Sequence, residues 1–101
     1  ALTTIAVVRP RFRQQIEVHL LLDAPGAQSV AVAGDWNGWE RNAQHLSDPD
    51  GDGVWEITFS IEPGSEYQYQ FVVDDERWVN DPRATLQIND GFGGVNSVLD
   101  I

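Results

Sequence analysis

The sequence predicts an all-β domain, folded as an antiparallel β-sandwich. Apolar and polar residues alternate with a period of two in several segments, and no segment sustains the 3.6-residue period of an amphipathic helix. Turn residues separate these segments at short intervals, which is typical of sandwiches with short strands. The 101 residues suit one small domain, in which we expect residues 14–101 to form the sandwich and residues 1–13 an N-terminal arm or linker stub.

Two strands are predicted in the first third of the chain. The strand at residues 14–23 places four apolar residues on one face: Ile16, Val18, Leu20 and Leu22. The tripeptide Ala-Pro-Gly at 24–26 then turns the chain. A second strand follows at residues 29–34, with Val30 and Val32 on one face.

The clearest strand signal spans residues 54–61. Its apolar residues all fall on one face: Trp55, Ile57, Phe59 and Ile61. After a turn at 62–65, residues 66–74 alternate again. This alternation sends one set inward (Tyr67, Tyr69, Phe71 and Val73) and another outward (Gln68, Gln70 and Val72). Three further short strands are predicted around 78–79, 85–88 and 97–101.

Charge and composition exclude several classes of function. Six basic against sixteen acidic residues give a net charge of −10, a field that repels phosphate backbones, so no nucleic-acid partner is expected. No segment approaches the ~18 apolar residues of a membrane span, so no membrane partner is expected either. The chain lacks cysteine, which rules out disulfides and thiolate zinc sites and agrees with the cytoplasmic location that we predict.

The segment DPDGDG at residues 48–53 matches the first half of a calcium-binding loop, with acids at positions 1, 3 and 5 and glycine at 6. The second half fails, because position 12 is Phe59, an inward residue of a predicted strand, and no helix flanks the loop. We therefore interpret the segment as an Asp- and Gly-rich turn. No metal or other cofactor is predicted.

Catalytic residues are not evident in the sequence. His19 falls on the outer face of a strand and His45 in a loop, and neither has a serine or carboxylate at a telling spacing. The acidic run at 74–76 reads as a solvated hairpin tip rather than a catalytic pair. We predict that this chain alone is not an enzyme.

The four tryptophans divide into two groups. Trp55 alternates with core residues, and Trp36 follows a strand whose register lets it fold over the core. Trp39 precedes the polar run at 40–42, and Trp78 lies near the surface end of a hairpin. An exposed indole is costly unless it meets a ligand or partner, so Trp39 and Trp78 are the candidate functional residues.

Five segments, taken together, resemble family 48 carbohydrate-binding modules: VAVAGDWNGW, DGVWEITF, YQYQFVVD, WVNDP and DGFGGVNSVL. The resemblance covers residues 16–101 in the family's order. The family includes the glycogen-binding domain in the β-subunit of AMP-activated protein kinase and domains that precede the catalytic barrel of branching and debranching enzymes. The resemblance implies an immunoglobulin-like, early-set sandwich that has no intrinsic catalysis and binds α-1,4-linked glucans such as glycogen or starch.

The resemblance also implies the binding residues. Trp39 and Trp78 match two tryptophans that stack on glucose rings. Asn96 matches an asparagine that hydrogen-bonds sugar hydroxyls, and Phe92 a large apolar residue that projects at the ligand. Gln70 replaces a lysine of the family, and it can still donate hydrogen bonds although it is neutral and shorter.

Two other differences from the kinase subunit bear on affinity: Gly94 replaces a threonine, and the stretch 71–78 is one residue longer. The chemistry of the residues agrees with a sugar ligand, since indoles cover the apolar C–H face of glucose and amides bond its hydroxyl rim. We expect a single-site dissociation constant of ~10⁻⁴ M, typical of shallow polar sites that gain by multivalency on a polymer. The alternative hypothesis is a protein-interaction or regulatory domain of the same fold that contacts other domains of a larger protein.

Overall fold

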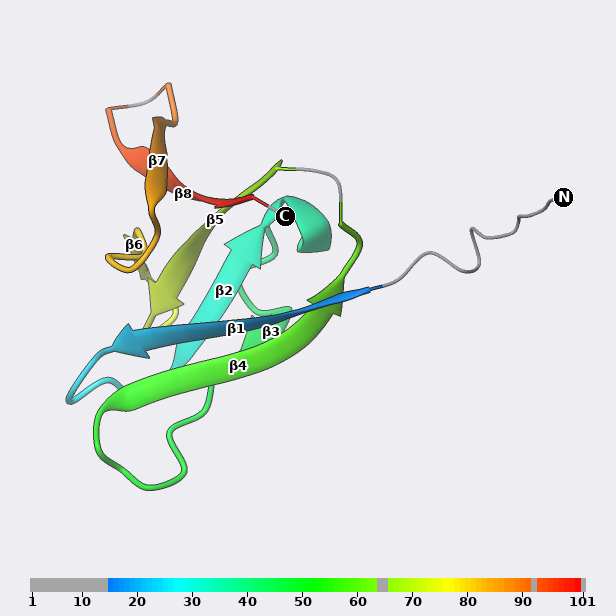
Figure 1. The fold of residues 1–101 in the computed structure, drawn as a ribbon. Helices are drawn as coiled ribbons and strands as arrows, with labels where there is room; N and C mark the ends of the chain where they lie inside the picture. The colour runs from blue at the N-terminus through cyan, green and yellow to red at the C-terminus, as the bar shows by residue number, and fades with distance from the viewer. Residues whose placement is uncertain (1–14, 64–65, 92, 101) are drawn as a thin grey trace, which may run out of the picture.

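Two antiparallel sheets face each other in the computed structural model, which describes residues 15–63, 66–91 and 93–100 (Figure 1). The all-β, immunoglobulin-like sandwich predicted from the sequence is confirmed. The predicted arm at 1–13 and the predicted site residue Phe92 lie outside the described residues. Over the described ranges, no helix is long and apolar enough to cross a membrane.

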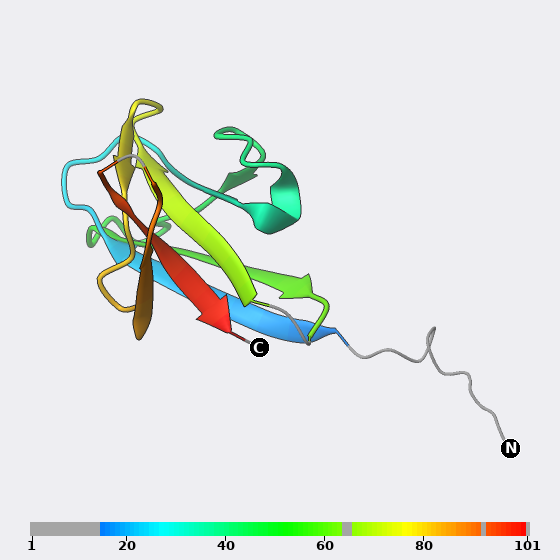
Figure 2. The same ribbon diagram turned by 90° about the horizontal axis from the view of Figure 1, so that it is seen from above.

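The smaller sheet pairs β1 (Ile16–Asp23) with β4 (Val54–Ile61). The larger sheet has the order β3-β2-β5-β8-β7, and β6 pairs with β5 beside this path. The bounds of its strands are Val30–Gly34 (β2), Gln44–His45 (β3), Glu66–Val73 (β5), Arg77–Val79 (β6), Leu86–Asn89 (β7) and Val95–Asp100 (β8). Seen from above, β1 and β4 lie across from β5 and β8 as a separate layer (Figure 2).

The predicted strands are observed within one or two residues of their expected bounds, and β4 has the bounds predicted. The strand missing from the prediction is β3. It has only two residues and no alternation of its own, and it is defined by pairing with Ala31 and Val32 of β2.

The core lies between the inner faces of the two sheets. The residues predicted to point inward from β1, β2 and β5 supply most of it, and the buried set is Val18, Leu20, Leu22, Val30, Val32, Leu46, Ile61, Tyr69, Phe71 and Val73. Full burial of one such side chain stabilises the fold by about 1.5–3 kcal/mol. Trp36 and Trp55 pack against this set, as predicted.

A buried polar network fixes the loop between β6 and β7. The Tyr69 hydroxyl donates to Asp81 Oδ2 at 2.7 Å, and the Asp81 amide donates to Ser97 Oγ at 2.7 Å. Gln87 Nε2 donates to the Asp81 carbonyl at 2.9 Å. Burial, and secondarily the Asp81 carboxylate, raise the pKa of Tyr69, so the phenol remains a neutral donor. The network therefore holds the segment that follows Trp78 in β6.

The acidic tip between β5 and β6 is exposed, as predicted, but it is also bonded to the chain that enters β2. The Asp74 carboxylate accepts the amides of Gln28 at 2.6 Å and Ser29 at 3.1 Å. These two hydrogen bonds lower the pKa of Asp74, because they favour its charged form. Asp74 and Asp75 both have positive φ angles, of 55° and 64°. The tip is thus a defined turn rather than a merely solvated one.

Candidate functional site

The turn GDWNGW at residues 34–39 sends its first indole into the core. Trp36 stacks on Phe59 with ring centroids 5.1 Å apart, and its Nε1 donates to Gln44 Oε1 at 2.6 Å. A Cβ on Gly34 would lie 2.8 Å from a ring carbon of Trp36, so only glycine admits this approach. The Asn37 side chain closes the turn by accepting the Gly34 amide at 3.0 Å. The structure therefore confirms that Trp36 points inward.

The second indole of the turn lies on the opposite, outer face of the larger sheet. Trp39 packs against three small or branched residues of that face: Ala31, Ala33 and Val72. Two alanines leave room for a flat ring on the sheet. Trp39 is therefore half-buried rather than fully exposed, which corrects the expectation of a free indole. Its Nε1 donates to Asp35 Oδ1 at 2.9 Å, and its φ of 61° is unusual for a bulky residue.

Trp78 lies on the same outer face. In the β5–β6 pair it is directly opposite Val72, the residue against which Trp39 packs. Trp78 remains 42% exposed, as predicted for a functional indole. Val72 points outward as predicted and is nevertheless fully buried, because Trp39 covers it. The two indoles thus flank one buried valine.

Three side-chain amides continue this face toward β8. Gln70 Nε2 donates to Asn96 Oδ1 at 2.6 Å and to the Val95 carbonyl at 3.1 Å. Asn96 Nδ2 in turn donates to Gln68 Oε1 at 3.0 Å. Gln68 and Gln70 are two residues apart on β5, so both share the outer face with Val72. The amides form one ordered chain, which we call the amide row (Gln70, Asn96 and Gln68).

The structure therefore brings together four of the five predicted site residues, Trp39, Gln70, Trp78 and Asn96, on the outer face of the larger sheet. Phe92 lies outside the described residues. The prediction missed Gln68, although the alternation along β5 already placed its side chain on the outward face. It also missed Asp35, for which the sequence carries no signal, because its role depends on contacts with Trp39 and β5.

The acidic loop at 48–53 has the form of a tight turn. Oxygens of Asp48, Asp50 and Asp52 lie within 4.8 Å of one another. They accept backbone amides of the same loop, for example that of Gly53 on Asp48 Oδ2 at 2.9 Å and that of Val54 on Asp52 Oδ1 at 2.9 Å. The bond from Val54 lowers the pKa of Asp52. Phe59, at the position of the twelfth ligand of a calcium loop, stacks on Trp36 instead.

We expect the melting temperature to be the same in EDTA and in millimolar Ca²⁺, to within about 1 °C, since a ligand that binds only the folded state would raise it. The loop carboxylates already have backbone partners. Differential scanning calorimetry checks this expectation. A rise of several degrees that is specific to Ca²⁺ over Mg²⁺ would contradict it and reinstate the calcium interpretation.

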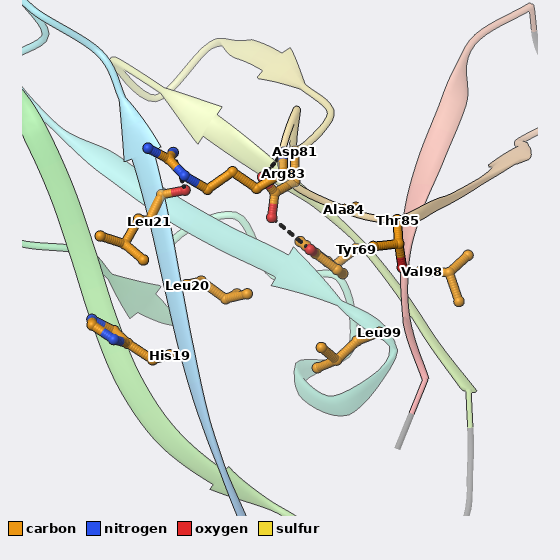
Figure 3. Close-up of a pocket in the computed structure, with 10 residues that line it drawn as sticks. All are labelled: His19, Leu20, Leu21, Tyr69, Asp81, Arg83, Ala84, Thr85, Val98 and Leu99. Atoms are coloured by element: carbon orange, nitrogen blue, oxygen red, sulfur yellow. Dashed lines mark hydrogen bonds between the residues drawn. The ribbon is translucent and has the colours of Figure 1, made fainter.

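A cavity of about 260 Å³ lies apart from the indoles, between β1 and the β7–β8 side of the larger sheet (Figure 3). Several of its polar groups are already bonded to other residues. Tyr69 donates to Asp81, and Arg83 reaches the Leu21 carbonyl at 3.3 Å and Asp23 at 3.4 Å. His19, at its edge, is 2.9 Å from Glu56 on the neighbouring strand.

Known proteins match most of the chain. The family model described as the glycogen recognition site of AMP-activated protein kinase matches residues 20–101. The 1,4-alpha-glucan branching enzyme GlgB 2 of Xanthomonas campestris pv. campestris (strain 8004) is 42% identical over 55 residues, which cover 54% of this chain and 7% of that enzyme. The GlgB enzyme of Leifsonia xyli subsp. xyli is 35% identical over 66 residues, 62% of this chain and 9% of the enzyme. The similarity thus spans less than a tenth of these relatives.

Proposed function

The chain belongs to the family described as the glycogen recognition site of AMP-activated protein kinase, and from this premise we propose that it binds α-1,4-linked glucan chains through the outer face of its larger sheet. In this proposal Trp39 and Trp78 stack on glucose rings, and Gln70 and Asn96 bind the hydroxyl groups. The module has no catalytic role of its own. Its ligand is the polysaccharide, glycogen or starch.

The observation that carries the proposal is the arrangement of two indoles around one buried valine, next to three side-chain amides. Glucose presents an apolar face of C–H groups and a rim of hydroxyls, and indoles and amides complement these two parts. Trp39 keeps its ring on the sheet through Asp35, so little rotational freedom remains to be lost on binding. A neutral sugar needs no charged partner, so the net charge of −10 does not oppose binding.

A second candidate function assigns the same face to a partner protein or a neighbouring domain. Leu86 and Ile88 of the edge strand β7 favour it, because they are apolar and are 46% and 43% exposed. Strand register places them beside Val98 and Asn96, next to the amide row. This alternative predicts that the face binds no free sugar.

Isothermal titration calorimetry separates the two functions. We expect maltoheptaose to bind with a dissociation constant of about 10⁻⁴ M, as in other shallow polar sites. Cellohexaose, whose β-1,4 linkages give a straight chain, is the control for the linkage and is expected to bind at least about tenfold more weakly than maltoheptaose or maltohexaose, a difference of about 1.4 kcal/mol. Absence of heat with maltoheptaose at millimolar concentrations would contradict the proposed function and favour the protein-interaction alternative.

A further inference from the structure

We propose that Gln68 is a further ligand-binding residue of this face. Its side-chain N–H groups donate hydrogen bonds to the ligand, because those of Gln70 are already bonded within the protein. The inference rests on the proposed function, since it assigns a role within the same site. Gln68 is partly buried on β5. It is hydrogen-bonded both to the amide row, through Asn96, and to Asp35, which holds the Trp39 indole. Nothing in the sequence distinguished it from the other outward residues.

The hydrogen bonds of the amide row leave different groups free at its two ends. A glutamine side chain has two N–H donors and one carbonyl acceptor. Gln70 donates both of its N–H groups, to the Val95 carbonyl and to Asn96 Oδ1, and no described residue donates to its Oε1. Gln68 accepts from Asn96 through Oε1, and among the residues that the structure describes its Nε2 has no partner. The row therefore presents an acceptor at Gln70 and donors at Gln68. The proposal differs here from the expectation that Gln70 can still donate hydrogen bonds to the ligand.

Gln68 is also attached to the stacking half of the site. Its backbone amide donates to Asp35 Oδ2 at 2.8 Å, while Asp35 Oδ1 accepts the Trp39 indole N–H at 2.9 Å. One carboxylate thus ties Trp39 to the residue whose Nε2 is free. In this proposal, a sugar stacked on Trp39 places its hydroxyl rim against the Gln68 side-chain amide. Because Asn96 already holds Oε1 of the same amide group, binding through Gln68 Nε2 loses little rotamer entropy.

The test uses Gln68→Met, which keeps the length of the side chain and removes its polar atoms. The matched control is Gln15→Met, the same change at an exposed position beside the smaller sheet. We expect Gln68→Met to weaken maltoheptaose binding about 5- to 10-fold, the cost of a lost hydrogen bond and a released Asn96, and Gln15→Met to leave it unchanged.

In the wild-type protein, the Nε2 protons of Gln68 are expected to shift in ¹H–¹⁵N spectra on titration, with the same dissociation constant as the indole protons of Trp39 and Trp78. This second measurement decides the matter even if Gln68→Met fails to fold. Affinity of Gln68→Met within twofold of the control, or Gln68 Nε2 protons that do not move at saturation, would overturn the inference alone. A wild-type protein that does not respond to maltoheptaose would instead overturn the proposed function.

Discussion

Replacement of Trp78 by alanine is expected to weaken maltoheptaose binding by about 30-fold or more, because removal of a central aromatic anchor costs about 2 kcal/mol or more. Trp78 is 42% exposed and lies on a three-residue strand, so its loss leaves the core of the sandwich unchanged. Calorimetric titration of the variant gives the affinity, and urea unfolding gives its stability. Trp78→Phe is expected to fall between the wild type and the alanine variant, since it keeps a smaller ring.

Leu86→Ala is the matched control for this variant. Leu86 has a similar exposure of 46% and shares the outer face, but it has no ring to stack on a sugar. We expect its affinity to change less than about threefold, which is below 1 kcal/mol. Equal affinities of Trp78→Ala and the wild type, with the fold intact, would contradict the proposal that Trp78 stacks on a glucose ring.

Replacement of Asp81 by alanine is expected to lower the free energy of unfolding by about 3 kcal/mol, through lost charge-assisted hydrogen bonds and an unsatisfied phenol. Asp81 is buried, and its carboxylate accepts from the Tyr69 hydroxyl and from the Arg83 amide at 2.9 Å. In a domain of this size, such a loss lowers the melting temperature by more than about 10 °C. Urea unfolding followed by tryptophan fluorescence measures it.

Glu76→Ala is the control for the loss of a carboxylate, since Glu76 is exposed in the hairpin tip, and it is expected to change stability by less than about 0.5 kcal/mol. A double-mutant cycle with Tyr69→Phe tests the bond itself, because contacting residues couple by about 0.5–3 kcal/mol. Additive effects of Asp81→Ala and Tyr69→Phe would show that this hydrogen bond does not hold the loop.

Most of the fold could be predicted from the sequence, because a strand with one buried and one exposed face alternates apolar and polar residues. Trp55, Ile57, Phe59 and Ile61 therefore identified β4 together with its inward face. The short β3 could not be found in this way, since two residues contain no period. The partner of each strand was also out of reach, because pairing depends on contacts between distant segments.

The candidate site could be predicted in part. Trp39 and Trp78 stood out as indoles in polar surroundings, but only the pairing of Trp78 with Val72 shows that they share a face. The half-burial of Trp39 depends on Ala31 and Ala33, whose small size is unremarkable in a strand sequence. The donor and acceptor pattern of the amide row is a property of three residues on two strands, so no local pattern contains it.

The central claim is that α-glucans bind to the outer face of the larger sheet, and chemical-shift mapping tests it most directly. ¹H–¹⁵N spectra are recorded while maltoheptaose is added to the wild-type protein. We predict saturable shifts for the indole N–H groups of Trp39 and Trp78 and for the side-chain amides of Asn96 and Gln68, and no shift for the core indoles of Trp36 and Trp55. Shifts confined to residues of β1 and β4, or to the lining of the cavity between β1 and β8, would contradict the claim.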